Sequence, residues 1–306
     1  MRVLITGARG LLGLDAVEVF SKKHEVIPLD YEELDVTDAV ATIATIQDAK
    51  PDLVLHFAGF RDLDQCESNP DKAYLVNTLG TRNVAVGCQK AGAVMLYSSS
   101  GYVYPADKRE PYTEFDETGP INVYGKSKLF AERVVESLLN KYFIVRLPML
   151  FGRHGERQRN PVVDILMTVQ EKGEITGIVD QIGSMGYTVH IARTMAQLVE
   201  SELYGVYHMS NEGSCSRYEF VEEVIKQAGL EGVRIRPIAS ADLNRPADRG
   251  RYCILRNFCL ESSLGPSLPS WRAALQECLQ AISPLGVGVA GSENSIVGFS
   301  SKQPAL

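Results

Sequence analysis

The sequence predicts an α/β fold: a Rossmann-type, doubly wound parallel sheet with a smaller C-terminal lobe. The first observation is a short β-rich run, residues 2–6, which passes through a loop with three glycines into a helical pattern. The second is the alternation of β-rich and helical segments up to about residue 147. Such alternation is typical of parallel sheets with helices on both faces. After residue 147 the alternation loosens, which indicates a second, smaller unit.

Length, composition and charge narrow the class of protein. The chain has 306 residues, of which 45% are hydrophobic and 23% charged, as in soluble globular proteins with a large core. Its net charge of −7 argues against a nucleic acid or an anionic membrane surface as partner. Six scattered cysteines without a Cys-x-x-Cys pair indicate free thiols in a reducing, cytoplasmic compartment. No apolar run approaches the roughly 18 residues of a membrane span, and no metal site is expected.

The glycine loop has the spacing G-x-x-G-x-x-G, formed by Gly7, Gly10 and Gly13. Glycines let the backbone turn tightly and approach a pyrophosphate, which binds at the N-terminus of the following helix. The spacing is one residue longer than the usual dinucleotide fingerprint, but the strand–loop–helix context is the one that this fingerprint requires. We therefore expect a dinucleotide cofactor, NADPH or NADH, at this loop.

Two charged residues near the loop give opposing indications about the cofactor. Asp30 ends the second expected strand, residues 25–29, at a distance from Gly10 where a carboxylate can accept hydrogen bonds from an adenosine ribose. Arg9 lies beside the glycines, where a guanidinium could instead hold a 2′-phosphate. Because partly exposed charges of opposite sign largely offset each other, we expect use of both NADH and NADPH.

Two further strands are expected to end at the same edge of the sheet. Residues 38–49 have a helical pattern, 52–56 form the third strand, 71–91 a long helix and 93–97 the fourth strand. His56 and the serines 98–100 then lie at the carboxyl edge, where α/β sheets bind ligands. We expect His56 to be a hydrogen-bonded packing residue rather than a catalyst. A serine hydroxyl at this edge can hydrogen-bond a carbonyl or alcohol, although serine clusters also form turns.

The segment 122–128 carries a Tyr-x-x-x-Lys pair at the start of a helical run, residues 126–140. Residues i and i+4 of a helix share one face, so Tyr124 and Lys128 are expected to point into the same space. A phenol with a pKa of about 10 transfers protons poorly at neutral pH, and an ammonium one turn away should lower that pKa. Such pairs also occur by chance. The glycine loop and the upstream serines favour the catalytic interpretation.

The remaining segments are expected to complete the sheet and build the lobe. A fifth strand covers residues 142–146, helices cover 161–172, 191–200, 216–228 and 271–281, and short strands lie within 173–186, 205–209 and 234–237. Ser216 and Glu219 have capping-box spacing. Residues 240–257 are expected to be a loop. The boundaries predict a dinucleotide-binding domain, 1–152 with 187–210, a substrate-binding lobe, 153–186 with 211–284, and a disordered tail, 285–306.

Taken together, these features resemble the extended short-chain dehydrogenase/reductase superfamily, and within it the dTDP-4-dehydrorhamnose reductase family and its nucleotide-sugar relatives. The likeness covers about residues 1–283. Its cofactor half, which is superfamily-wide, lies in residues 7–13, 34–38, 99–104 and 122–128. The later segments 180–184, 213–216 and 268–272 narrow the resemblance to this family.

The resemblance implies a role for each matching residue. The cofactor would contact the glycines of the loop and Leu11, with Asp35 and Val36 near its adenine. Ala58 and Gly59 would lie beneath the cofactor, and Lys128 would bind its nicotinamide ribose. Tyr124 would be the acid, and Ser100 would take the place of the family's Thr or Ser. Arg249 would bind the diphosphate of a nucleotide sugar. The implied reaction is hydride transfer from NAD(P)H to C4 of a nucleotide-linked 4-keto-6-deoxysugar, and a homodimer is a further expectation.

Several positions depart from the family's pattern near the expected sugar. Gly101 stands where the family usually has Asp, Met149 where it often has an aromatic residue, Met185–Gly186 for a Pro-Thr pair and Gly250 for Pro. These changes leave the identity of the sugar open. Residues 56–59 and the three serines are also similar to those of UDP-glucose 4-epimerase, so an epimerase that retains NAD remains an alternative. Another is a non-catalytic regulatory subunit similar to the β-subunit of methionine adenosyltransferase.

Overall fold

The computed structural model describes residues 1–154, 160–265 and 268–282, and at its centre is a six-stranded parallel sheet. The strand order is β10-β5-β4-β3-β1-β2, so the order reverses at β1. The strands are β1 (Arg2–Thr6), β2 (Glu25–Leu29), β3 (Leu53–His56), β4 (Val94–Ser100), β5 (Tyr142–Leu147) and β10 (Gly205–His208). The predicted Rossmann-type sheet is confirmed. The tail predicted for residues 285–306 lies outside the described residues.

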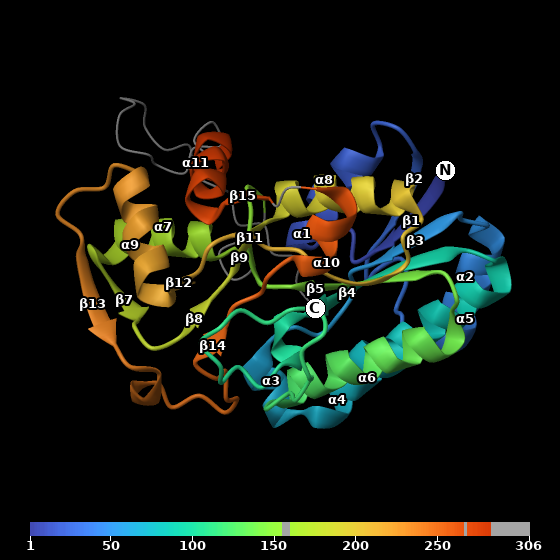
Figure 1. The fold of residues 1–306 in the computed structure, drawn as a ribbon, viewed down its shortest axis with the longest axis horizontal. Coiled ribbons are helices and arrows are strands. Elements are labelled where there is room, and N and C mark those ends of the chain that lie inside the picture. Colours follow the sequence, from blue (N-terminus) through green and yellow to red (C-terminus); the bar gives the residue numbers. More distant parts are fainter. Residues whose placement is uncertain (155–159, 266–267, 283–306) are drawn as a thin grey trace.

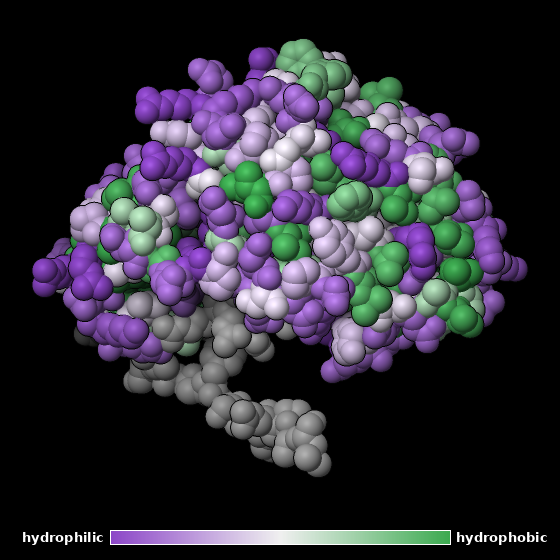
Figure 2. Space-filling view, turned by 90° about the horizontal axis from the view of Figure 1, so that it is seen from below, coloured by the Kyte–Doolittle hydropathy of each residue, from purple (hydrophilic) through white to green (hydrophobic). Residues whose placement is uncertain are grey.

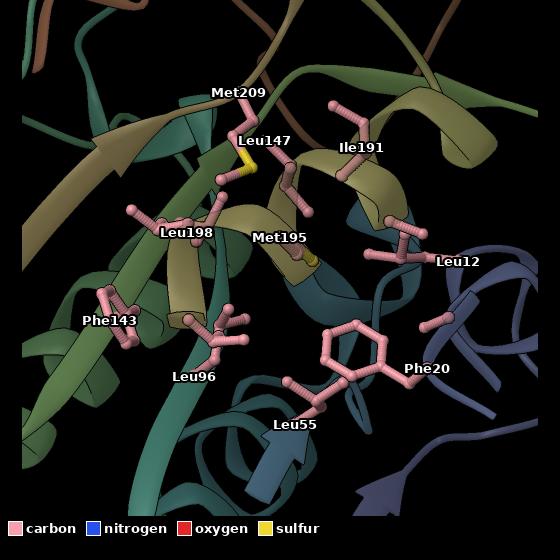
Figure 3. Close-up of a cluster of buried hydrophobic side chains, with 14 of the residues drawn as sticks. Leu12, Phe20, Leu55, Leu96, Phe143, Leu147, Ile191, Met195, Leu198 and Met209 are labelled. Atoms are coloured by element: carbon pink, nitrogen blue, oxygen red, sulfur yellow. The ribbon is translucent and has the colours of Figure 1, made fainter. Parts of the chain in front are cut away.

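Alternating side chains give this sheet two hydrophobic faces. Val3 and Ile5 of β1 belong to one buried cluster, and Leu4 between them belongs to another, because successive side chains of a strand point to opposite faces. Helices α1 (Leu11–Phe20) and α8 (Thr188–Ser201) cover the first face. Helices α2 (Ala39–Ala49), α5 (Thr81–Ala91) and α6 (Val123–Leu138) cover the second (Figure 1). Figure 3 shows Phe20 and Met195 of the first layer meeting side chains of the sheet.

The long helix predicted over residues 71–91 is interrupted. The chain instead forms α3 (Leu63–Ser68), α4 (Pro70–Tyr74), a π-helical turn η1 (Leu75–Gly80) and α5. Within η1, the Asn77 side chain is buried and exchanges hydrogen bonds with the backbone of Phe60, at 2.7 Å and 2.9 Å. Its amide also donates to Ser127 Oγ at 2.9 Å. The π turn therefore connects the loop after β3 to helix α6, a long-range contact that helical periodicity does not indicate.

A second group of elements surrounds its own buried cluster, which includes Phe151, Leu166, Phe220 and Trp271. It contains β6 (Met149–Phe151), α7 (Pro161–Lys172), β7 (Glu174–Ile178), β8 (Ile182–Gly183), β9 (Met185–Tyr187), β11 (Asn211–Glu212), β12 (Cys215–Ser216), α9 (Arg217–Gln227), β13 (Arg234–Ile238), β14 (Tyr252–Cys253), β15 (Leu268–Ser270) and α11 (Trp271–Ile282). The capping box of Ser216 and Glu219 is confirmed at the start of α9.

The segment 240–257, expected to be a loop, contains a 3-10 turn, η4 (Ser240–Asp242), and strand β14. Strand β14 pairs with β8, whose other neighbour is β12. The rest of the segment is irregular, and the prediction missed this strand because a two-residue strand has no periodicity and is formed by its distant partner. Helix α10 (Phe258–Leu264), which packs against β10, was also not predicted.

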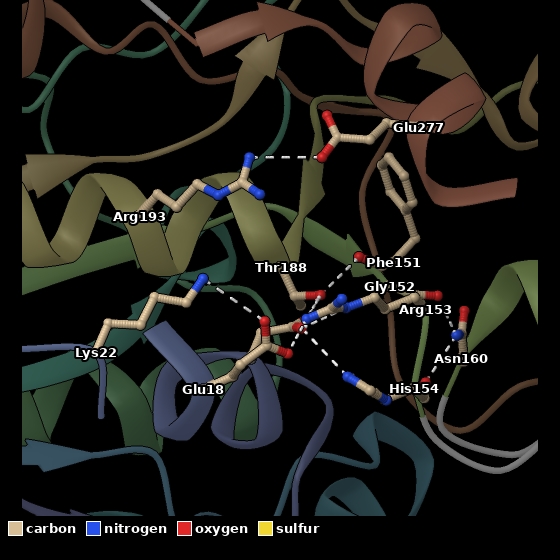
Figure 4. Close-up of polar contacts among 11 residues, drawn as sticks. Glu18, Lys22, Phe151, Gly152, Arg153, His154, Asn160, Thr188, Arg193 and Glu277 are labelled. Atoms are coloured by element: carbon tan, nitrogen blue, oxygen red, sulfur yellow. Dashed lines mark hydrogen bonds and ion pairs between the residues drawn. The ribbon is translucent and has the colours of Figure 1, made fainter. Parts of the chain in front are cut away.

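The chain after β6 is fixed to α1 by the buried carboxylate of Asp15. Figure 4 shows Arg153 of this stretch reaching Glu18 of α1. Arg153 Nε lies 3.0 Å from Asp15 Oδ1, and Thr188 Oγ donates to Asp15 Oδ2 at 2.6 Å. Arg153 also pairs with Glu18. The ligand atoms of Asp15, Glu18 and His154 lie close enough together to hold a metal ion in principle. Arg153 contacts both carboxylates and Lys22 Nζ lies 3.8 Å from Glu18 Oε1, so ion pairing accounts for this cluster.

No helix in the described part of the chain combines the length and apolar character that a membrane crossing requires.

Candidate active site

The glycine loop leaves no room for side chains at two positions. Gly7 has a φ of +70°, and a Cβ there would lie 2.6 Å from Ala58 N. A Cβ on Gly13 would lie 2.2 Å from Gly7 O. Helix α1 begins directly after Gly10, so its first amides and the positive end of its dipole lie beside this bare backbone. The loop thus has the form of a cradle for a phosphate group.

A cleft of about 1440 Å³ runs from the glycine loop to the second group of elements. Its walls include every site residue predicted from the sequence except Arg9: Gly7, Gly10, Leu11, Gly13, Asp30, Asp35, Val36, Ala58, Gly59, Ser100, Tyr124, Lys128 and Arg249. The far end is formed by residues of β6, β8, β14 and the start of α9. The size suits a ligand larger than a single small molecule, such as a dinucleotide together with a second substrate.

Arg9 takes part in a surface ion-pair group instead of lining the cleft. Its guanidinium contacts Glu33 and lies 2.7 Å from Glu32 Oε2. Its backbone amide donates to Asp30 Oδ2 at 2.6 Å. Two carboxylates that follow β2 therefore offset the charge expected to favour a 2′-phosphate. Asp35 accepts hydrogen bonds from the amide and hydroxyl of Thr37, at 2.9 Å and 2.8 Å, which holds the turn that lines this part of the cleft.

The predicted triad converges where β4 ends and α6 begins. Asn122 caps α6 by accepting a hydrogen bond from Gly125 N at 2.8 Å, which places Tyr124 in the first turn. Lys128 follows one turn later and is buried. Ser100 ends β4, and its hydroxyl is hydrogen-bonded with the Tyr124 side chain. The structure therefore brings these three side chains together at the wall of the cleft.

Burial controls the protonation of this triad. It raises the pKa of Tyr124 to about 12, and the hydrogen bond with Ser100 opposes that rise. It lowers the pKa of Lys128 to about 7, while the negative charge of Glu132 opposes that fall. The expectation that Lys128 would bring the pKa of Tyr124 down is not met. The physical reason is that removing a phenolate or an ammonium from water costs more here than their attraction returns.

Lys128 has two neighbours that were not singled out in the sequence. Its ammonium lies 4.3 Å from the centre of the Tyr97 ring. Glu132 is buried one turn further along α6 and bonds to Ser99 and Arg146. The i+4 spacing from Lys128 was a signal that could have identified Glu132. Nothing local pointed to Asn77, whose position depends on the π turn.

His56 is fully buried, as expected of a packing residue. Its ring nitrogens lie 2.7 Å from Thr6 Oγ1 and 3.0 Å from Thr81 Oγ1. Burial lowers its pKa to about 3, which keeps the imidazole neutral. These contacts join β3 to β1 and α5, beneath the cleft.

At the far end of the cleft, Arg249 is paired with a carboxylate. Its two terminal nitrogens lie 3.0 Å and 2.8 Å from the carboxylate oxygens of Asp64. Gly101, which follows Ser100, lies against Cys253: a Cβ on Gly101 would be 2.8 Å from Cys253 Sγ. A larger side chain at this position would therefore require the Cys253 side chain to shift.

Comparison with known proteins shows similarity along most of the chain. Residues 1–283 match the family described as RmlD substrate binding domain. The spore coat polysaccharide biosynthesis protein SpsK of Bacillus subtilis is 33% identical over 91% of this chain and 97% of its own length. The dTDP-4-dehydrorhamnose reductase of Streptomyces griseus is 33% identical over 92% and 94%, respectively.

Solved structures show the same similarity along most of the chain. The crystal structure of dTDP-4-dehydrorhamnose reductase from Bacillus anthracis in complex with NADP has a TM-score of 0.88, with 36% identity over 91% of this chain and 98% of that one. A UDP-glucose 4-epimerase from Thermus thermophilus, solved with NAD, has a TM-score of 0.79 at 21% identity, over 92% of this chain and 99% of that one, a likeness of fold alone. This chain therefore belongs to the RmlD substrate binding domain family, together with the dTDP-4-dehydrorhamnose reductases to which it is similar along most of its length.

Proposed function

We propose that this chain transfers a hydride from NADPH or NADH to the 4-keto group of a dTDP-linked 4-keto-6-deoxysugar. The observation that carries the proposal is the meeting of Ser100, Tyr124 and Lys128 in one cleft with the glycine loop. The curated relatives named as dTDP-4-dehydrorhamnose reductases support the substrate class. The relative solved with NADP supports the cofactor class.

Each residue of the triad has a distinct task. Ser100 and Tyr124 hold the ketone oxygen by hydrogen bonds, and Tyr124 gives that oxygen its proton. A pKa raised to about 12 suits an acid, because the phenol keeps its proton until the oxygen becomes a more basic alkoxide. Lys128 holds the nicotinamide ribose and supplies positive charge beside the phenol when it is protonated.

The glycine loop and its surroundings fit a dinucleotide. The bare backbone at Gly7 and Gly13 and the N-terminus of α1 hold the pyrophosphate, with Leu11 beside it. Asp30, Asp35 and Val36 line the adenosine end, and Ala58 and Gly59 lie under the cofactor. Reduced nicotinamide supplies the hydride. Residues 1–152 with 187–210 bind the cofactor, and residues 153–186 with 211–284 bind the nucleotide sugar.

A homodimer completes the proposal. Leu79 and Phe130 are exposed by 39% and 46%, an unusual amount for large apolar residues of η1 and α6. Figure 2 views the molecule from the side on which α4 and α6 lie in Figure 1. Hydrophobic side chains gather on the right-hand half of that face. Sedimentation of the wild type and of Leu79→Glu tests this: the variant should sediment as a monomer. A monomeric wild type would contradict it.

The function is tested with purified protein, dTDP-4-dehydrorhamnose and either reduced cofactor, by following the loss of near-ultraviolet absorbance of the nicotinamide. Wild type should oxidise the cofactor only when the sugar is present, and Tyr124→Phe should not. Protein that retains NAD and interconverts nucleotide-sugar 4-epimers without added cofactor would instead be an epimerase. Protein without either activity that co-purifies with methionine adenosyltransferase would be a regulatory subunit.

A further inference from the structure

Arg217, the first residue of α9, lines the far end of the cleft. Within residues 1–154, 160–265 and 268–282, no ion pair involves its guanidinium. Its side-chain contacts are with sulfur atoms instead, to Met149 Sδ and, at 4.0 Å, to Met185 Sδ. Thioether sulfur is a weak acceptor and does not neutralise a guanidinium.

The position of Arg217 is costly for the fold by itself. A cation at the N-terminus of a helix meets the positive end of the helix dipole, which disfavours it. Side chains at such positions that break a local rule without compensation within the protein are commonly functional. The compensation that Arg217 needs is a negative charge in the cleft.

Two contacts locate the Arg217 side chain relative to the reacting groups. Met149 comes two residues after Leu147, which is paired in register with Ser100. Cys253, whose sulfur lies against Gly101, also lies near the guanidinium: burial raises the pKa of Cys253 to about 11, and the charge of Arg217 opposes this rise. The guanidinium therefore lies between the start of β6, two residues after the strand that pairs with Ser100, and β14.

The other basic residues at this end of the cleft are already engaged. Arg249 binds both oxygens of Asp64, so most of its charge is balanced. Arg251 is exposed and acts electrostatically on Asp180. Arg217 thus lines this end of the cleft without an ion pair to an acid among the described residues.

We propose that Arg217 binds the β-phosphate of the nucleoside diphosphate sugar, the phosphate that carries the sugar, and that Arg249 positions the lobe through Asp64 instead of binding that phosphate. This inference rests on the proposed function, because it requires a nucleoside diphosphate substrate. A guanidinium offers the two parallel donors that a phosphate accepts. A contact with the phosphate that carries the sugar fixes the distance between C4 and the triad, which makes Arg217 a determinant of sugar position.

The test compares nucleotides that differ only by the β-phosphate. Binding of dTDP and of dTMP is measured by titration calorimetry on full-length protein with saturating NADPH, so that the cofactor site is filled. For Arg217→Gln, the Kd of dTDP should rise about 10- to 100-fold, as expected for the loss of a charged hydrogen bond, while that of dTMP changes less than about twofold. Arg217→Lys keeps the charge but not the two parallel donors, so it should give an intermediate loss of affinity for dTDP. This variant also guards against a folding defect in Arg217→Gln.

Arg234→Gln is the matched control, because it removes one positive charge from exposed strand β13 outside the cleft. It should leave both constants unchanged. Equal losses of affinity for dTDP and dTMP in Arg217→Gln, or a loss of affinity selective for dTDP in Arg249→Gln alone, would overturn the proposal.

If wild type prefers UDP or GDP to dTDP, the proposed sugar nucleotide is wrong, and the same comparison with UMP or GMP still decides the role of Arg217. If wild type binds no diphosphate better than its monophosphate, the inference fails.

Discussion

Arg146 donates two hydrogen bonds to the Glu132 carboxylate, Nε to Oε1 at 3.1 Å and Nη2 to Oε2 at 2.8 Å. Both side chains are almost fully buried. Ser99 bonds to the same carboxylate. Arg146 Nη1 also donates to Tyr104 Oη at 2.6 Å, and that oxygen lies 2.8 Å from His208 Nε2. The ion pair therefore joins helix α6, one turn after Lys128, to strands β4, β5 and β10.

Removing one partner of this pair should be strongly destabilising. Glu132→Gln leaves the Arg146 guanidinium buried without a counter-charge, and we expect the free energy of unfolding to fall by about 3–5 kcal/mol in urea denaturation. The double variant Glu132→Leu with Arg146→Met should lose less, because no charge remains buried. A single variant that loses less than about 1 kcal/mol would show that water reaches the pair.

The triad variants should separate catalysis from cofactor binding. Tyr124→Phe keeps the ring and loses the proton, so turnover should fall about 10²–10⁴-fold with an unchanged cofactor Kd. Lys128→Ala should lower turnover and also raise that Kd. Ser100→Ala removes one neutral hydrogen bond, worth about 0.5–1.5 kcal/mol, and should cost least. Steady-state kinetics and cofactor titration give the ordering. Near wild-type turnover in Tyr124→Phe would disprove the assignment of the acid.

Buried histidines should make the protein sensitive to mild acid. Burial lowers the pKa of His56 and of His208 to about 3, with Arg146 adding to the effect at His208. The unfolded chain takes up protons on these side chains as pH falls below about 6.5, whereas the folded protein does not. The stability present above that pH should then be lost toward pH 3, by about 1.4 kcal/mol per pH unit for each histidine.

Urea denaturation near neutral pH and about two pH units lower measures this loss. His208→Gln should reduce the slope of the free energy of unfolding against pH by the share of one histidine. A slope that is the same in the wild type and in this variant would show that His208 becomes protonated in the folded state.

Gly101 and Cys253 should behave as a coupled pair. A methyl group at residue 101 would lie 2.8 Å from Cys253 Sγ, so Gly101→Ala should overpack the joint between the sheet and β14 and cost about 1–3 kcal/mol. Adding Cys253→Ala removes the sulfur and should restore most of that loss, while Cys253→Ala alone provides the reference for the cycle. Additive effects of the two changes, measured by thermal or urea unfolding, would mean that Leu255 rather than Cys253 sets the limit.

Arg9 should contribute only modestly to the choice of cofactor. Its ion pairs with Glu32 and Glu33 are exposed, and such pairs are typically worth about 0–1 kcal/mol, so a 2′-phosphate can compete for the guanidinium. Arg9→Ala should weaken the use of NADPH by no more than about fivefold and leave NADH nearly unchanged. Glu32→Gln should shift the preference slightly toward NADPH. Comparing kcat/KM for both cofactors checks this, and an equal loss for both in Arg9→Ala would place Arg9 away from the 2′ position.

The sequence by itself determined those features that depend on neighbours a few residues apart. The strand, glycine loop and first helix follow one another directly, so their pattern predicted the cradle of Gly7 and Gly13. The four-residue spacing of Tyr124 and Lys128 predicted their common face on α6, and the spacing of Ser216 and Glu219 predicted the cap of α9. The spacing of residues a few positions apart is therefore enough to predict their local geometry.

The tertiary structure decided everything that depends on burial or on a distant partner. Asp64 and Arg249 are 185 residues apart, and only the fold shows that the arginine is already paired. The helix spacing suggested that the pKa of Tyr124 would fall, whereas burial by surrounding segments raises it. Desolvation and charge compensation are sums over every element that packs around a group. No stretch of sequence contains that sum, so the electrostatic state of the cleft had to come from the folded chain.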